Sequence, residues 1–63
     1  MIRVELPDGT VTTASAGTVD DILQQLGQNP YELLAVRNDE LLLAEDMVED
    51  GAEIKLVSIV HGG

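Results

Sequence analysis

The sequence predicts an α+β fold in which one helix packs across one face of a mixed sheet of four or five strands. Three features indicate this fold: apolar and charged residues alternate at the start of the chain, one later stretch has helical spacing, and the longest β-prone stretch comes last. The expected order is two strands, a helix and three more strands. A helix of about two turns cannot bury its own apolar face, so it must lie against the sheet.

The length of 63 residues allows one domain with a small core. Apolar residues make up 44% of the chain and Tyr31 is the single aromatic residue, so the core must be aliphatic. We expect Tyr31 to cover the edge of that core. We assign residues 1–60 to the domain and residues 61–63 to a flexible tail.

The first fourteen residues are predicted to form a hairpin. Residues 2–6 alternate apolar and charged side chains, which is the pattern of a half-buried strand. Pro7-Asp8-Gly9 supplies the turn, because proline fixes φ and glycine accepts a positive φ. Residues 10–14 are rich in Thr and Val and return as the second strand.

A helix is predicted over residues 19–26. Thr18 and Asp21 have the spacing of a capping box, in which each side chain bonds the backbone of the other residue. Four apolar residues then share one helical face: Val19, Ile22, Leu23 and Leu26. Gly27 suits the left-handed position that ends a helix, and Pro30 prevents the helix from resuming.

Three strands are predicted after the helix. Residues 33–37 are apolar enough for a central strand, residues 38–40 have turn chemistry, and residues 41–43 form a short strand. We expect a helical turn over residues 44–48. Residues 53–60 are the longest β-prone stretch and are apolar on both faces, so this strand should be central and pair in parallel with the first strand.

The composition excludes several classes of function. The chain has no Cys, which removes disulfides, thiolate metal sites and iron–sulfur clusters. Three basic residues stand against twelve acidic ones, and the net charge of −9 repels nucleic acids and anionic lipids. No apolar stretch reaches the about 18–20 residues that span a bilayer. We expect a cytoplasmic protein that binds neither nucleic acid nor membrane. Three explanations of its acidity stay open: solubility, adaptation to a salty cytoplasm, or attraction of a partner with a basic surface.

The residues that carry chemistry form no catalytic or metal site. His61 has no second His or Cys to share a metal with, so it is interpreted as a solvated spacer. Glu45-Asp46 and Glu49-Asp50 are interpreted as solvated turn residues, not as paired acid–base catalysts. No nucleophile and base can be paired. We therefore expect neither an enzyme nor a bound metal or cofactor.

The chain ends in Gly62-Gly63, shortly after its longest strand. Because glycine lacks Cβ, such a tail can pass through a narrow channel and present an unhindered carboxylate. Chain ends are also often frayed and without a role, so the pair alone leaves both interpretations open.

The features described so far follow one another in a fixed order: the hairpin, the single helix, the Asn38-Asp39-Glu40 turn, the Glu49-Asp50-Gly51-Ala52-Glu53 approach to the last strand and the terminal glycines. In that order the whole chain resembles the ubiquitin-like β-grasp sulfur carriers and small modifiers. This family includes the thiamine and molybdopterin sulfur carriers ThiS and MoaD and the small archaeal modifier proteins. The short chain and single helix look more like ThiS and the shorter archaeal modifiers.

The resemblance implies that the chain is the substrate of an E1-like adenylating enzyme. That enzyme would use ATP to adenylate the Gly63 carboxylate, because a resting carboxylate is a poor electrophile. The acyl group would then become a thiocarboxylate for thiamine, molybdopterin or tRNA thiolation, or form an isopeptide bond with a lysine of a target protein. Lys55 is the only lysine here and thus the candidate acceptor within this chain. Sulfur donor and acceptor enzymes are the other expected partners.

Val57 and Ile59 are expected to face away from the helix, close to the tail. Exposed aliphatic residues in that place indicate a docking patch, with Arg37 as a neighbour. Two alternatives are that they are ordinary surface residues or that a dimer covers them, although we expect a monomer when the protein is free. The second hypothesis for function is a non-covalent β-grasp interaction module, which would not need a free Gly-Gly end.

Overall fold

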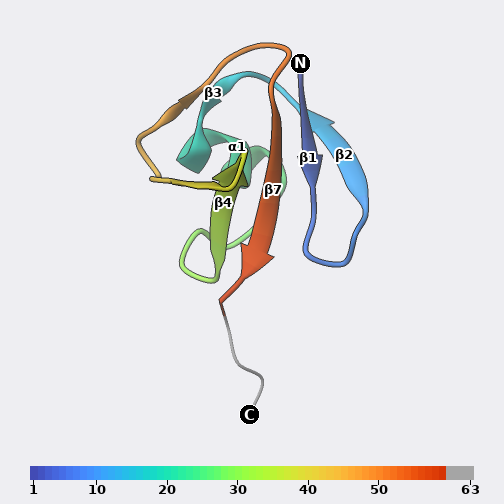
Figure 1. Ribbon diagram of the computed structural model, residues 1–63, viewed down its shortest axis with the longest axis vertical. Helices are drawn as coiled ribbons and strands as arrows, with labels where there is room; N and C mark the ends of the chain where they lie inside the picture. Colours follow the sequence, from blue (N-terminus) through green and yellow to red (C-terminus); the bar gives the residue numbers. More distant parts are fainter. Residues whose placement is uncertain (60–63) are drawn as a thin grey trace.

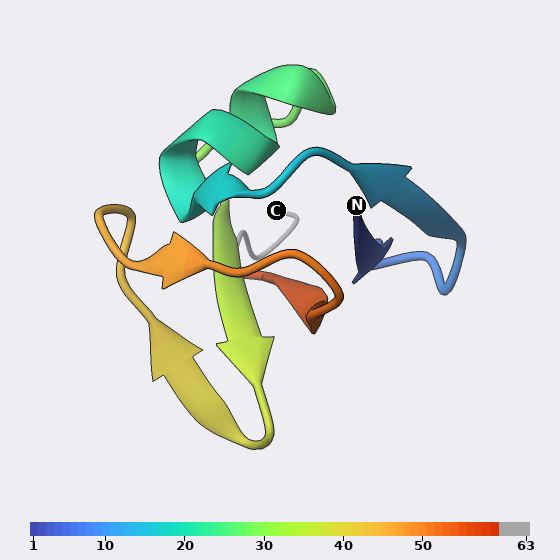
Figure 2. The same cartoon turned by 90° about the horizontal axis from the view of Figure 1, so that it is seen from above.

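The computed structural model describes residues 1–59. Its elements are β1 (Ile2–Glu5), β2 (Val11–Ala14), β3 (Gly17–Thr18), α1 (Val19–Gln25), β4 (Leu33–Arg37), β5 (Glu40–Leu42), β6 (Met47–Val48) and β7 (Glu53–Ser58). Five strands form one sheet in the order β2-β1-β7-β4-β5, and α1 lies across one face of it (Figure 1, Figure 2). The predicted α+β fold, with one helix on a mixed sheet, is confirmed.

The last strand is central, as its two apolar faces predicted. β7 pairs in parallel with β1, where Val4 lies opposite Ile54, and antiparallel with β4, where Ala35 lies opposite Leu56. Ile54 and Leu56 are at most 2% exposed and pack under the helix. The parallel pairing with β1 is possible because the helix carries the chain across the sheet between the two strands.

The helix begins and ends through the contacts that its sequence predicts. Thr18 Oγ1 accepts a hydrogen bond from the Asp21 backbone N–H at 3.1 Å, and the Asp21 carboxylate accepts one from the Thr18 N–H at 3.4 Å. This capping box satisfies N–H groups that have no partner within the helix. At the other end Gly27 has φ +68°, the left-handed conformation that residues with a Cβ seldom adopt.

The core lies between α1 and the sheet and is entirely aliphatic. Its residues are Ile2, Val4, Ala14, Val19, Ile22, Leu23, Leu33, Ala35, Val48, Ile54 and Leu56. Among residues 1–59, no polar or charged side chain is buried. The core therefore depends on burial of apolar surface and close packing, without polar groups to fix its arrangement.

Two short strands were not predicted. β3 and β6 pair antiparallel as a separate two-stranded sheet next to the start of α1, so the helical turn predicted over residues 44–48 is wrong at Met47–Val48. The reason lies in the first N–H groups of the helix, which need acceptors from outside it. The N–H groups of Val19 and Asp20 donate to the carbonyls of Asp46 and Ala44, both at 3.0 Å, and hold this segment extended along the helix start.

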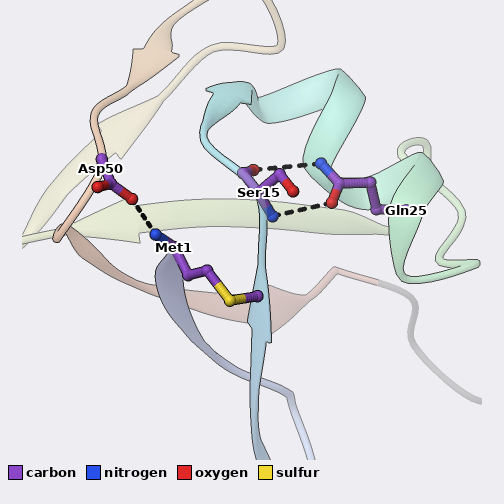
Figure 3. A network of polar contacts seen from close by, with 4 residues as sticks. All are labelled: Met1, Ser15, Gln25 and Asp50. Atoms are coloured by element: carbon purple, nitrogen blue, oxygen red, sulfur yellow. Dashed lines mark hydrogen bonds and ion pairs between the residues drawn. The ribbon is translucent and has the colours of Figure 1, made fainter.

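Polar contacts fasten two connections to the rest of the fold (Figure 3). The Ser15 N–H donates to Gln25 Oε1 at 2.9 Å and Gln25 Nε2 donates to the Ser15 carbonyl at 3.2 Å, which ties the segment after β2 to the end of α1. The Met1 amino group pairs with the Asp50 carboxylate, and the Gly51 N–H donates to the Met1 carbonyl at 3.0 Å. The segment that leads into β7 is therefore held beside the start of β1.

Tyr31 does not cover the core edge as expected, because its side chain is 87% exposed. Its backbone N–H donates to Asn29 Oδ1 at 2.9 Å, and the Glu32 N–H donates to the Asn29 carbonyl at 3.1 Å. These bonds form a turn that holds the ring outside the molecule. The aliphatic core is complete without it.

Candidate docking face and reactive tail

The chain leaves the sheet at the end of β7. The Ile59 N–H still donates to the Glu32 carbonyl at 3.0 Å, so the chain follows the start of β4 for one residue beyond the strand. This point lies at the opposite end of the molecule from the N-terminus (Figure 1). His61, Gly62 and Gly63 lie outside the described residues, and the reactive tail stays a prediction.

The sheet face opposite α1, here called the outer face, carries the side chains that alternate with the core residues. The register pairs Leu34 with Val57, and it places Val36 between Lys55 on β7 and Leu41 on β5. Directly opposite side chains in antiparallel strands lie about 4.5–5.5 Å apart, so apolar groups from three strands meet here. Ile59 continues the alternation of Lys55 and Val57.

We call five residues the outer apolar patch: Leu34, Val36, Leu41, Val57 and Ile59. The exposed fractions are 37% for Leu34, 56% for Leu41, 40% for Val57 and 43% for Ile59, and Val36 is half-buried. A contiguous apolar patch on the surface of a small domain is a common mark of an interaction site. Within the patch, Val57 and Leu34 lie near the end of β7 and the start of β4, and Val36 and Leu41 lie farther along the face.

The sequence indicated only part of this patch. Val57 and Ile59 were predicted to be exposed, and both are. Leu34 and Val36 were not singled out, because five residues that are nearly all apolar show no alternation from which a face can be assigned. Arg37 lies three residues beyond Leu34 along β4, next to the 38–39 turn and away from Val57, so the structure does not bring these two predicted docking residues together.

Charged side chains on the outer face form two pairs between β1 and β7. Arg3 lies opposite Glu53 and Glu5 lies opposite Lys55. Arg3 Nε is 3.6 Å from Glu53 Oε2, and Lys55 Nζ is 3.6 Å from Glu5 Oε2. All four side chains are well exposed, so each pair contributes little to stability. Their effect is to leave the outer face without net charge.

The net charge of −9 therefore belongs to the rest of the molecule. Away from the outer face, Arg37 is the one cation among the side chains of residues 1–59. The acidic residues outside the face are Asp8, Asp20, Asp21, Glu32, Asp39, Glu40, Glu45, Asp46, Glu49 and Asp50. A neutral, partly apolar face inside an acidic surround can attract a basic partner at long range without desolvating many charges on contact.

Two hollows border Lys55. One of about 440 Å³ is lined by Val36, Arg37, Asn38, Asp39, Ala52, Glu53 and Lys55. The other, of about 370 Å³, is lined by Arg3, Glu5, Val11, Glu53, Ile54 and Lys55. The second hollow contains the ion pair of Lys55 with Glu5.

Residues 1–59 contain neither a cluster of metal-ligating side chains nor a helix that could span a membrane. No group of three or more His, Cys, Asp or Glu within residues 1–59 could hold a metal ion. Within the same range, α1 is too short and too polar to cross a bilayer.

The Asp8 carboxyl lies in the β1–β2 turn and has a lowered pKa. The Thr10 backbone N–H donates to Asp8 Oδ1 at 2.9 Å in the β1–β2 turn. This hydrogen bond lowers the pKa of the Asp8 carboxyl below 3.8, because it favours the charged form. Asp8 is fully exposed in a turn, and its shift reflects the turn structure and not a catalytic site.

Comparisons with known proteins add to this geometry. The model of the ThiS family matches residues 4–63. The sulfur carrier protein TtuB of Thermus thermophilus is 40% identical to this chain over 43 residues. The aligned residues make up 68% of this chain and 66% of TtuB, so the chain spans just under two thirds of the length of that relative. A solved structure of a computationally designed protein based on human erythrocytic ubiquitin superimposes with a TM-score of 0.71 at 23% identity, over 98% of this chain and 94% of that one. The fold is therefore the ubiquitin-like β-grasp.

Proposed function

The chain belongs to the ThiS family, and from this membership we propose that it is a sulfur carrier, a protein that is itself the substrate of an activating enzyme. The observation that carries the proposal is that the family match runs through Gly62 to Gly63. The relative that is 40% identical is named a sulfur carrier, which supports the same role.

The proposed chemistry begins at the Gly63 carboxylate. An oxygen of this carboxylate attacks the α-phosphorus of ATP in the E1-like enzyme, the α–β phosphoanhydride bond breaks, and pyrophosphate leaves. The resulting acyl-adenylate has AMP as its leaving group, which the carboxylate itself lacks. A persulfide sulfur displaces AMP, and a thiol then cleaves the S–S bond to release the C-terminal thiocarboxylate.

The outer apolar patch is the proposed docking surface for the activating enzyme. Its position next to the end of β7 supports this role, because an enzyme that binds there can hold the following residues in its active site. The paired charges beside it leave the contact area neutral, so docking there avoids the cost of burying unpaired ions. Arg37, at the far end of β4, would contact the partner only at the rim.

Conjugation to target lysines is a second use of the same adenylate. In that case an amine displaces AMP in place of the persulfide, and Lys55 is the acceptor that this chain itself offers. A non-covalent interaction module remains the alternative from a different class of function. Such a module would bind its partner through the outer apolar patch and would not use the C-terminal carboxylate.

An adenylation assay tests the proposal. The protein is mixed with the candidate activating enzyme from the same genome and labelled ATP, and pyrophosphate release is measured. We expect release with the full chain and none after removal of Gly63, while circular dichroism shows the same fold for both. Replacement of Gly62 by Phe should also stop the reaction, because a bulky side chain obstructs a narrow channel.

The controls separate the two classes of function. Pyrophosphate release that is unchanged in the protein without Gly63 would contradict the carrier proposal. Activity in the host that survives fusion of another domain after Gly63 would favour the interaction module, because that module needs no free carboxylate.

A further inference from the structure

Lys55 lies in the middle of the outer face and not at its rim. It is the only lysine of the chain and belongs to the central strand β7. The registers place it opposite Glu5 on β1 and opposite Val36 on β4. Its side chain is 62% exposed and its Nζ is 3.6 Å from Glu5 Oε2. The single lysine amine of this chain is thus presented on the surface that we propose for docking.

The surroundings of Lys55 determine what a group attached to Nζ would cover. The outer apolar patch begins next to it, since Val36 is its partner on β4 and Val57 follows two residues later on the same face. Two residues along a strand correspond to about 7 Å. Both hollows also have Lys55 in their lining. A substituent longer than a few atoms can therefore reach over the patch or into one of the hollows.

We propose that acylation of Lys55 closes the outer face to the activating enzyme and so prevents activation of the C-terminus. The inference rests on the proposed function. In the step itself the Lys55 ammonium loses a proton, and its nitrogen attacks the acyl carbon of an acyl-adenylate, such as the activated C-terminus of another copy. The N–C bond forms, the C–O bond to the phosphate breaks, and AMP leaves with the electron pair. The nitrogen gives up a second proton as the amide forms, and both protons pass to water.

Acylation has two consequences for docking. The attached group covers apolar surface that the partner would bury, and the amide carries no charge. Glu5 then loses its partner, and the outer face changes from neutral to a charge of −1, because Arg3 alone is left to balance Glu5 and Glu53. A partner that docks on this face must then desolvate an unpaired carboxylate, which disfavours binding.

The test uses chemical acylation of the whole protein. The chain has two kinds of amine, Lys55 and the N-terminus, and the latter pairs with Asp50 at the edge of the molecule. A succinimidyl ester of a short polyethylene glycol modifies both amines. In the Lys55→Arg variant it modifies the N-terminus alone. Pyrophosphate release with the activating enzyme is measured for each protein before and after treatment.

Treatment of the natural sequence should reduce kcat/KM for pyrophosphate release by about tenfold or more, as expected for a group placed inside an interface. The treated and untreated Lys55→Arg proteins should differ little from one another. Equal rates for the treated and untreated natural sequence would overturn this inference alone. Loss of the fold on treatment would overturn it too, because the effect would not then be on docking. Absence of release from the untreated natural sequence would instead contradict the proposed function.

Discussion

Leu56 and Val57 are neighbours in the sequence with opposite surroundings. Leu56 is fully buried beneath α1, whereas Val57 is 40% exposed on the outer face. Successive side chains of a strand point to opposite faces of the sheet. A substitution at position 56 therefore affects the core, and one at position 57 affects the outer face. A single substitution at each position can therefore test both the core and the patch.

Leu56→Asp should unfold the domain, and Val57→Asp should leave it folded. A carboxylate at position 56 would be buried among aliphatic side chains without a partner, at a cost of several kcal/mol, which is comparable with the whole stability of about 5 kcal/mol expected for a small domain. At position 57 the carboxylate stays in water on the outer face, where it should weaken the proposed docking of the activating enzyme. Circular dichroism and thermal unfolding measure the fold; two equally folded variants would contradict the assignment of faces.

Asp8 predicts a small pH dependence of stability. Its pKa is lower in the folded protein than in the unfolded chain because the Thr10 N–H donates to its carboxylate. The ionised carboxylate therefore favours the folded state above the unfolded pKa of about 3.9, and this contribution is lost as pH falls through the folded pKa. Carbon NMR should show Asp8 titrating below 3.8. In Asp8→Asn the local contribution should vanish; an unshifted Asp8 would contradict the turn.

At the scale of elements, local patterns were sufficient for the hairpin, the helix and the parallel pairing of the first and last strands. Each of these has a signal within its own residues, such as the alternation over 2–6 or the capping box at Thr18. β3 and β6 could not be predicted, because each is two residues long and their pairing joins segments that are far apart in the sequence. The Ala44 and Asp46 carbonyls, just before β6, accept from the first N–H groups of α1. The faces of β4 likewise required the register, since its apolar residues do not alternate with polar ones.

The helix cap gives a prediction at this scale. Thr18→Ala removes the hydroxyl that accepts from the Asp21 N–H and should lower the free energy of unfolding by about 1 kcal/mol. Thr18→Ser retains the hydroxyl and is the matched control, with a much smaller loss. Urea unfolding of the three proteins measures the difference. Equal losses in the Ala and Ser variants would mean that the capping bond does not stabilise the helix.

At the scale of the whole molecule, charge is distributed unevenly. The outer face is neutral, while ten acidic residues and Arg37 occupy the rest of residues 1–59. Composition alone showed an acidic protein, for which a basic partner was one explanation, but it could not show that both acids of the outer face are paired with cations. That pairing depends on the register of β1 with β7, which places each of two cations opposite a carboxylate.

The uneven charge predicts opposite effects of salt on stability and on docking. Repulsion among the acidic residues should weaken as salt is added, so the thermal midpoint should rise between low and moderate salt. Association with a basic activating enzyme should slow over the same range, because the attraction is screened beyond a Debye length of about 8–10 Å. Stopped-flow association and thermal unfolding measure the two effects. A flat midpoint would contradict the first expectation, and a salt-independent association rate the second.

We propose that the carboxylate of Gly63 is the group that this protein carries in activated or sulfurated form. The most direct measurement is the intact mass of the protein purified gently from its native host, without reducing agents or strong nucleophiles. We expect a population whose mass corresponds to the exchange of one oxygen for sulfur, localised to Gly63 by fragmentation and absent when Gly63 is deleted. A single unmodified mass, under conditions in which the host makes its thiolated products, would contradict the claim.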